Sequence, residues 1–299
     1  MTDNHPDVDV LIVSLCAAER ATAIRRAIDT ALSQQGVQAR VTIVVNGQRF
    51  DRELFEALKR QRGVRVLYQT EPSIFLARRY AREEVRAPFF GFLDDDDQLL
   101  PGALATRVRA LVSDAEADVV VTDGLLSEGL SESLMLGDVA AIRQDPLHSL
   151  LARNWLATAS ALFRTESISP DYFDVTIRSN DMTYLAFRLA LEKRVIFVEV
   201  PTYRKTYSPD SISLTPSWAL PSLDTLDKML MFPMPASVRR GIRTKCAAAA
   251  HEISNIYRER GEAAPAWRYH LRSLMEPGGL LRYALYTRHL FGIRRRVRP

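Results

Sequence analysis

The sequence contains little cysteine and no long apolar run. Its 299 residues include two cysteines, Cys16 and Cys246, which lie far apart and offer neither a metal-binding spacing nor a disulfide framework. This usage is typical of a reducing compartment, so we predict a cytoplasmic location. No apolar run approaches the roughly 20 residues of a membrane-spanning helix. The first residues lack the basic start and apolar centre of a signal peptide. We therefore expect a soluble or peripheral protein.

Glycine-rich phosphate-binding motifs are also absent. No Gly-x-Gly-x-x-Gly follows the first predicted strand, and no Gly-x-x-x-x-Gly-Lys-Ser/Thr occurs anywhere. Both the dinucleotide-binding fingerprint and the P-loop are therefore disfavoured. His148, His251 and His270 share no spacing typical of metal ligands, and the chain has no internal repeat.

Basic and acidic residues are unevenly distributed. From Pro216 to the end there are 15 Lys and Arg against 6 Asp and Glu, and the totals of 40 and 36 leave 25 basic and 30 acidic residues before Pro216. A basic segment can bind anionic lipid, nucleic acid or an acidic protein. Residues 280–298 mix leucines and aromatics with arginines. They fit a helix in a membrane interface, and they fit equally a helix packed on the protein with a solvated basic end.

Four consecutive aspartates, at 94–97, form the most informative motif. They follow the apolar residues 88–93, which we expect to form a buried strand. Carboxylates this close together raise one another's pKa, and burial raises it further. A divalent cation such as Mg²⁺, Mn²⁺ or Ca²⁺ would offset that cost. The alternative is a solvated acidic turn before the next helix, whose dipole favours acids at its N-terminus.

Predicted strands and helices alternate through the first part of the chain. Strands are expected at 8–14, 41–45, 64–68, 88–93 and 118–122, and helices at 21–35, 52–61, 74–86 and 103–113. This alternation predicts βα units and a mostly parallel sheet, in which ligands bind beyond the carboxyl ends of the strands. Asn46 and the aspartates both fall at such ends, so we expect one shared cleft. After Pro216 the pattern predicts helices at 237–260, 265–275 and 280–290.

In this order the motifs resemble those of family 2 glycosyltransferases. The strongest is Phe-Leu-Asp-Asp-Asp-Asp at 92–97 with Pro-Gly at 101–102, which matches the family's Phe-Leu-Asp-x-Asp-Asp-x-x-x-Pro-Gly. Weaker matches lie at 44–47, 76–79, 179–190 and 198–213. The resemblance implies a GT-A fold, a Rossmann-like α/β/α sandwich, as the catalytic domain over 1–215. Its nucleotide-sugar half would end near 125, its acceptor half would follow, and 216–299 would be a basic helical extension.

The resemblance also implies a reaction. A hexosyltransferase of this family would move a sugar from a nucleotide-diphosphate sugar, first of all a UDP-sugar, to a hydroxyl of a glycan or lipid-linked acceptor. Mn²⁺ or Mg²⁺ would assist. Asp181 would be the general base of an inverting transfer. Alternatively, Asp181 favours a helix dipole and Asn180 caps that helix. Asp97 is expected either to support the metal ligands or to cap the helix after the aspartates, and the cap is favoured.

The remaining site predictions follow from the same motifs. The donor-binding residues are expected to be Ser14, Asn46, Arg78, Asp94 and Asp95. Asp94 and Asp96 are expected to hold the metal. The acceptor-binding residues are expected to be Trp155 and Asn180. Arg78 could equally lie on a solvated helix face, and Trp155 could equally be a core residue.

Two departures from the family pattern bear on these roles. Asn46 stands where the family often has an aspartate that reads the base, although an amide can still pair with an imide. No histidine follows Tyr203 and Arg204, where the family often places a metal ligand. Either water and phosphate complete the metal shell, or metal binding is weak without the donor, or Lys205 supplies positive charge instead.

Two other functions compete with a glycosyltransferase. A nucleotidyltransferase would need a glycine-rich loop after the first strand, which Ala-Ala-Glu-Arg at 17–20 does not provide. A catalytically silent nucleotide-binding or glycan-binding scaffold protein would tolerate substitution of Asp96 and Asp181. As partners we predict a nucleotide sugar, a glycan or lipid-linked acceptor and an anionic membrane that contacts the basic tail, but no nucleic acid.

Overall fold

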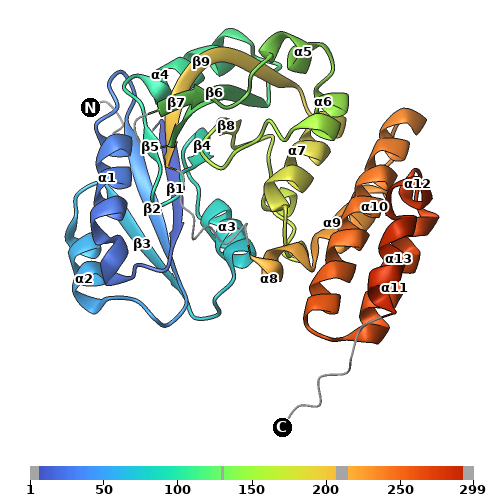
Figure 1. Cartoon of the computed structure of the whole chain (residues 1–299). Coiled ribbons are helices and arrows are strands. Elements are labelled where there is room, and N and C mark those ends of the chain that lie inside the picture. Colours follow the sequence, from blue (N-terminus) through green and yellow to red (C-terminus); the bar gives the residue numbers. More distant parts are fainter. Residues whose placement is uncertain (1–6, 129–130, 207–214, 292–299) are drawn as a thin grey trace. The chain divides into compact units, whose positions relative to one another are not determined.

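The computed structural model describes residues 7–128, 131–206 and 215–291 (Figure 1). The predicted motif residues at 207–213 and the arginines at 294–298 lie outside these ranges. The chain divides into two compact units. Unit 1 comprises Met1–Thr176 and Leu185–Tyr207, and unit 2 comprises Ile177–Tyr184 and Ser208–Pro299.

Unit 1 is built on a mixed sheet, in which the described residues form nine strands. The strands are β1 (Val8–Ser14), β2 (Ala39–Asn46), β3 (Val64–Gln69), β4 (Phe89–Phe92), β5 (Gln98–Leu99), β6 (Val119–Glu128), β7 (Ser131–Leu134), β8 (Ala161–Arg164) and β9 (Val195–Thr206). The α-helices are α1 (Ala21–Leu32), α2 (Arg52–Arg60), α3 (Ile74–Glu83), α4 (Ala103–Ser113), α5 (Val139–Gln144), α6 (Pro146–Ala152) and α7 (Asp181–Glu192), whose first turn belongs to unit 2. Two 3₁₀ turns are η1 (Ala18–Arg20) and η2 (Pro170–Tyr172).

The strand order is β3-β2-β1-β4-β8-β6-β9-β5, with β7 paired to β6. The neighbours within β3-β2-β1-β4 are parallel, as the βα alternation predicted, and β6 is parallel to β9. β8 lies between β4 and β6 and pairs with both in the antiparallel direction, and β5 pairs antiparallel with β9. β8 and β5 are too short to leave a periodic pattern in the sequence, so the antiparallel pairings were not predicted.

Local sequence explains the parallel half. β1 and β2 are almost wholly buried runs of β-branched and aliphatic residues, as expected for strands covered on both faces. In Figure 1, α1 and α2 lie on one side of these strands and α3 lies on the other. Side chains cap two helices of this half: Asp51 accepts from Leu54 N at the start of α2, and Ser73 accepts from Leu76 N at the start of α3. The loops after β1, β2 and β4 therefore open at one edge of the sheet.

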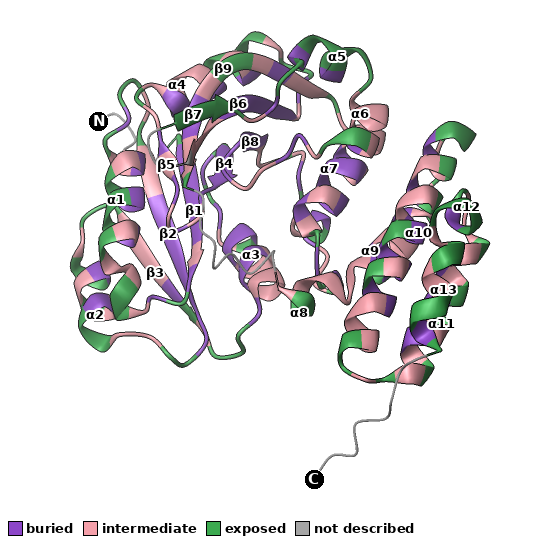
Figure 2. Cartoon of the chain, in the orientation of Figure 1, coloured by how far each residue is buried: buried purple, intermediate pink, exposed green. Residues whose placement is uncertain are grey.

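Unit 2 is helical after residue 215. Its helices are α8 (Pro216–Ala219), α9 (Ser222–Met229), α10 (Ala236–Glu259), α11 (Ala263–Met275), α12 (Gly279–Tyr283) and α13 (Thr287–Leu290), with a 3₁₀ turn η4 (Ala284–Tyr286) between the last two. The three helices predicted here are confirmed, and the third contains η4. α10 packs along α11, and Ile242, Cys246 and Ile253 are buried on α10 (Figure 2). Within the described ranges, no helix is long and apolar enough to cross a membrane.

Candidate functional site

The sheet brings Ser14, a predicted donor-binding residue, to the aspartates. β1 and β4 are parallel with Leu11 opposite Phe92, and Leu93 N donates to Leu11 O at 2.9 Å. The residues that follow both strands therefore meet at the carboxyl edge. Ser14 Oγ donates to Asp95 Oδ2, and Cys16 N donates to Ser14 Oγ at 2.9 Å. Ser14 thus positions Asp95 by a buried hydrogen bond.

Arg20, which the sequence analysis did not assign to the site, forms an ion pair with two aspartates. It lies on the 3₁₀ turn directly after β1. Its Nε donates to Asp95 Oδ2 at 3.1 Å, its Nη2 donates to Asp95 Oδ1, and the same nitrogen donates to Asp96 Oδ2 at 3.0 Å. The one signal for this role was an arginine six residues after the first strand, at the edge where the ligand was expected.

Two further cations approach Asp94. Arg78 Nη2 on α3 lies 3.8 Å from Asp94 Oδ1, and Lys205 Nζ on β9 lies 3.5 Å from Asp94 Oδ2. The antiparallel pairing of β5 with β9 places Gln98 opposite Arg204. Lys205, the next residue on β9, therefore lies beside Asp97, the residue that precedes Gln98. Lys205 Nζ is 3.6 Å from Asp97 Oδ2. The interpretation that Lys205 supplies positive charge at this site therefore agrees with its placement.

The prediction that Asp97 caps the next helix is wrong. α4 begins at Ala103, its N-cap is Gly102 with φ 76°, and it has no side-chain cap hydrogen bond. The chain first forms the short strand β5, which keeps Asp97 away from the helix. Asp97 is instead buried, and Thr206 N donates to its Oδ1 at 3.3 Å.

The cluster mixes four carboxylates with three cations. Burial raises the pKa of Asp95, against the lowering effect of Arg20 and Ser14. Burial and the nearby Asp94 raise the pKa of Asp97 to about 8. Burial lowers the pKa of Lys205, but the attraction of Asp94, Asp97 and Asp96 outweighs the effect of burial, and the net pKa is raised. The three cations therefore offset part of the negative charge of the aspartates.

Asn46 and Arg78 are held by specific contacts. Asn46 Oδ1 accepts from Ser73 N at 2.8 Å and from Gln69 Nε2 at 3.1 Å, so the end of β2 fixes the start of α3. Arg78 is 6% exposed and donates to Thr158 Oγ1 at 3.3 Å, which rules out the solvated helix face. Their roles toward a nucleotide stay predictions.

Asp181 and Asn180 belong to unit 2. Asp181 opens α7, and the exposed Asn180 before it has φ 52°, a left-handed conformation that asparagine tolerates. Asn180 O accepts from Tyr184 N at 2.9 Å. Thr225 Oγ1 on α9 donates to the carbonyl of the buried Ser179 at 2.9 Å. The loop that presents Asp181 is thus fixed within its own unit, and its catalytic role stays a prediction.

Trp155 is a core residue. It is 1% exposed, its Nε1 donates to Pro146 O at 2.9 Å, and its ring packs edge-on against Phe197 at 5.2 Å between centroids. An indole enclosed in this way has no open face on which a sugar could stack. The structure therefore contradicts the prediction that Trp155 binds the acceptor.

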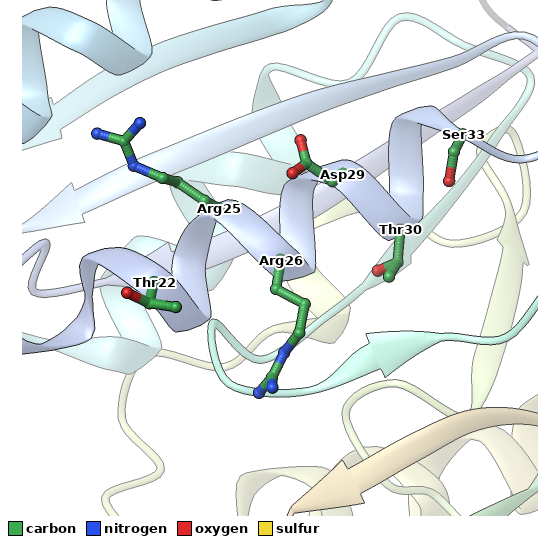
Figure 3. Close-up of a pocket in the computed structure, with 6 residues that line it drawn as sticks. All are labelled: Thr22, Arg25, Arg26, Asp29, Thr30 and Ser33. Carbon is green, nitrogen blue, oxygen red and sulfur yellow. The ribbon is translucent and has the colours of Figure 1, made fainter.

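A hollow of about 460 Å³ lies elsewhere, along α1 (Figure 3). Thr22, Arg25, Arg26, Asp29, Thr30 and the following Ser33 line it. All six residues come from a single helix and its C-cap, and none is a predicted site residue. The aspartate cluster, not this hollow, is therefore the candidate site.

The carboxylates suit a divalent cation that substrate helps to bind. Asp94 and Asp96 keep about a third of their side-chain surface exposed (30% and 34%), whereas both oxygens of Asp95 already accept hydrogen bonds. Within residues 7–128, 131–206 and 215–291, no three His, Cys, Asp or Glu side chains are grouped to hold a metal ion. Mg²⁺ and Mn²⁺ are commonly bound by one or two carboxylates with substrate phosphates. Asp94 and Asp96 fit this arrangement. The described residues do not fit a site in which protein side chains supply all the metal ligands.

Comparison with known proteins agrees with this geometry. Residues 12–145 match the model of the family described as Glycosyl transferase family 2. No curated protein matches the chain. Among solved structures, S. aureus TarS 1–349 in complex with UDP-GlcNAc has a TM-score of 0.61 and 12% identity, over 89% of this chain and 81% of that one.

Two further TarS structures are also similar. One described as S. aureus TarS has a TM-score of 0.62 and 15% identity over 89% of this chain, which spans 49% of that longer chain. TarS 1–349 in complex with UDP has a TM-score of 0.55 and 13% identity, over 86% and 74% of the two chains. At such identities the similarity establishes the fold, which is of the GT-A type expected from the sequence.

Proposed function

We propose that the protein, whose residues 12–145 match the model of glycosyl transferase family 2, transfers a sugar from a nucleotide-diphosphate sugar to an acceptor hydroxyl. A UDP-sugar is the proposed donor, consistent with the UDP and UDP-GlcNAc complexes of the structurally similar TarS. The acceptor is a glycan or a lipid-linked glycan, and the reaction is of the hexosyltransferase type in the cytoplasm. The observation that carries the proposal is the cluster of aspartates and cations at the carboxyl edge of β1 and β4.

The cluster supplies the groups that a nucleotide diphosphate needs. Arg78 and Lys205 lie beside Asp94 and provide fixed positive charge for phosphate oxygens. Asp94 and Asp96 would hold Mn²⁺ or Mg²⁺ together with the diphosphate. When bound, the cation acts as a Lewis acid that stabilises negative charge on the departing diphosphate. Ser14 and Arg20 orient Asp95, which is proposed to contact the donor, and Asn46 is proposed to read the base.

Asp181 is the proposed general base. In a single displacement the acceptor oxygen attacks the anomeric carbon while the bond from that carbon to the diphosphate oxygen breaks. The acceptor proton passes to the Asp181 carboxylate, and the configuration at the anomeric carbon inverts. Asn180 precedes Asp181 in a fixed loop and is exposed, which suits an acceptor contact.

A ligand screen tests this function. We expect nucleoside diphosphates and their sugars to raise the melting temperature of the full chain when Mn²⁺ or Mg²⁺ is present, because a ligand that binds only the native state stabilises it. The donor should give a larger shift than other nucleotide sugars of the same base. If no nucleotide sugar stabilises the protein with either metal, the proposed function is wrong.

A further inference from the structure

The outward side of residues 279–290 carries apolar and basic side chains together. α12, η4 and α13 follow one another without interruption, so these residues form one helical path. Leu281 and Leu285 are 93% and 80% exposed. Arg288, which is also exposed, continues their i, i+4, i+7 stripe, and the exposed Arg282 lies beside it.

The opposite side of this path is fixed on α10 and α11. The His251 ring of α10 stacks on Tyr283 at 4.1 Å between centroids and 17° between planes. His270 Nε2 of α11 shares a 2.7 Å hydrogen bond with Thr287 Oγ1, and Leu290 is 2% exposed. These contacts set the rotation of the path, so Leu281 and Leu285 cannot turn into the core of unit 2 without breaking them.

Residues 277–299, which include this face, contain arginines and no acidic residue. Glu276 is the last acidic residue of the chain, and the 23 residues after it contain six arginines. Exposed leucines beside arginines that form no ion pair with the described residues complement a surface that is negatively charged above and apolar beneath. A nucleic acid would satisfy the arginines and leave the leucines in water, and a second copy of the face would oppose arginine to arginine.

We propose that the tail face, defined by Leu281, Arg282, Leu285 and Arg288, binds the surface of an anionic lipid bilayer. The leucines enter the boundary between headgroups and acyl chains, and the arginines contact lipid phosphates. The helical path lies in the membrane plane. The proposal rests on the geometry of unit 2, so it stands or falls independently of the donor site.

Vesicle sedimentation tests the proposal with the full chain. We expect it to pellet with phosphatidylcholine vesicles that contain about a third phosphatidylserine, and to stay in solution with phosphatidylcholine alone. Binding should weaken with added salt, because screening reduces the arginine contribution. A truncation would remove the packed residues Tyr283 and Leu290 and confuse unfolding with lost binding, so point variants of exposed residues are preferable.

Two double variants separate the components of the tail face. Arg282→Glu with Arg288→Glu should weaken binding at least about 25-fold, since each arginine near an anionic surface contributes about five-fold. Arg60→Glu with Arg62→Glu, at exposed positions of unit 1, is the matched control with the same change of net charge and should bind as wild type.

Leu281→Gln with Leu285→Gln should weaken binding about ten-fold or more at unchanged charge. The control is Val112→Gln, at a position 66% exposed on α4. Insertion can be read directly from an environment-sensitive dye on Leu281→Cys. Cys16 and Cys246 are buried and should not react in the folded protein. The dye spectrum should shift to the blue with anionic vesicles, and the same dye on Val112→Cys should not respond.

Three results would overturn the proposal. The first is equal binding to neutral and anionic vesicles. The second is a pair of observations: the leucine variant binds vesicles as well as wild type does, and the arginine variant binds single-stranded RNA more weakly. Together they would identify a nucleic-acid surface. The third is a leucine variant that changes the oligomeric state in sedimentation velocity and not the vesicle affinity, which would identify an interface between copies of the chain.

Discussion

Replacement of Arg20 by glutamine is the sharpest test of the charge arrangement at the site. Arg20 reaches both oxygens of Asp95 and one oxygen of Asp96. The Asp95 side chain is 9% exposed, so after the substitution its carboxylate would keep the Ser14 hydroxyl but lose its counter-ion. Burial already raises the pKa of Asp95, and the variant should raise it further.

The expected loss of stability can be bounded. Breaking a buried ion pair costs about 3–5 kcal/mol, and one hydrogen bond to a charged group contributes about 1.5–3 kcal/mol. The Arg20 side chain is 38% exposed, so water offsets part of the loss and the lower end applies. We expect the free energy of unfolding of unit 1 to fall by about 2 kcal/mol, which is roughly 4–8 °C in melting temperature for a unit of this size.

The assay must report on unit 1 alone. Trp155 is buried in unit 1, whereas Trp218 and Trp267 belong to unit 2. In a Trp218→Phe, Trp267→Phe background, Trp155 fluorescence therefore follows urea unfolding of unit 1. Arg25→Gln, at an exposed position of α1, is the matched control and should change stability by less than about 0.5 kcal/mol.

A double-mutant cycle completes the test. Once Asp95→Asn has removed the buried charge, Arg20→Gln should cost much less, with a coupling energy of about 1–2 kcal/mol. A single Arg20→Gln variant as stable as wild type, or a coupling energy near zero, would show that the ion pair does not hold the aspartates in place.

Four further variants probe other parts of the chain. Asp181→Asn should lower turnover by about 10²–10⁴-fold while nucleotide affinity, measured by calorimetry, is unchanged; wild-type turnover would exclude it as the base. Burial lowers the pKa of both His270 and His251, and repulsion from His270 lowers the pKa of His251 further. As the pH falls, the unfolded chain therefore binds protons at a higher pH than the folded chain does. The free energy of unfolding of unit 2 should therefore fall as the pH drops below about 6.5, and His270→Gln should reduce this slope in urea titrations at pH about 7.5 and about 5. Gly124→Ala places Cβ 2.2 Å from the buried Tyr203 ring and should destabilise unit 1 by about 3 kcal/mol. Tyr203→Phe removes a buried hydroxyl that has no partner among the described residues, so it should not destabilise unit 1. Equal melting temperatures for the two variants would contradict this packing.

The parallel half of the sheet could be predicted because its strands and helices each leave a strong local pattern. The expected strand at 8–14 coincides with β1, and the expected helix at 103–113 coincides with α4. β8 and β5 contain four and two residues, and only long-range pairing defines them. Their antiparallel direction was therefore not accessible from periodicity.

The site was predictable in part for the same reason. Ser14, Asp94 and Asp95 come together because parallel strands end at one edge, a rule that needs no side-chain detail. Arg20 was missed because an arginine after a strand has no motif of its own. The misassignment of Asp97 arose because β5 separates it from α4, and that of Trp155 because its ring packs on Phe197 of the distant strand β9.

Calorimetric titration of UDP in the presence of Mn²⁺ tests most directly whether the aspartate cluster binds the donor. We expect the wild-type chain to bind UDP, and Asp96→Ala to lose at least about ten-fold in affinity because a ligand of the cation is gone. Glu56→Ala, at an exposed position of α2, is the control and should bind as wild type. Equal UDP affinity in wild type and Asp96→Ala, with both proteins folded, would show that the donor binds elsewhere.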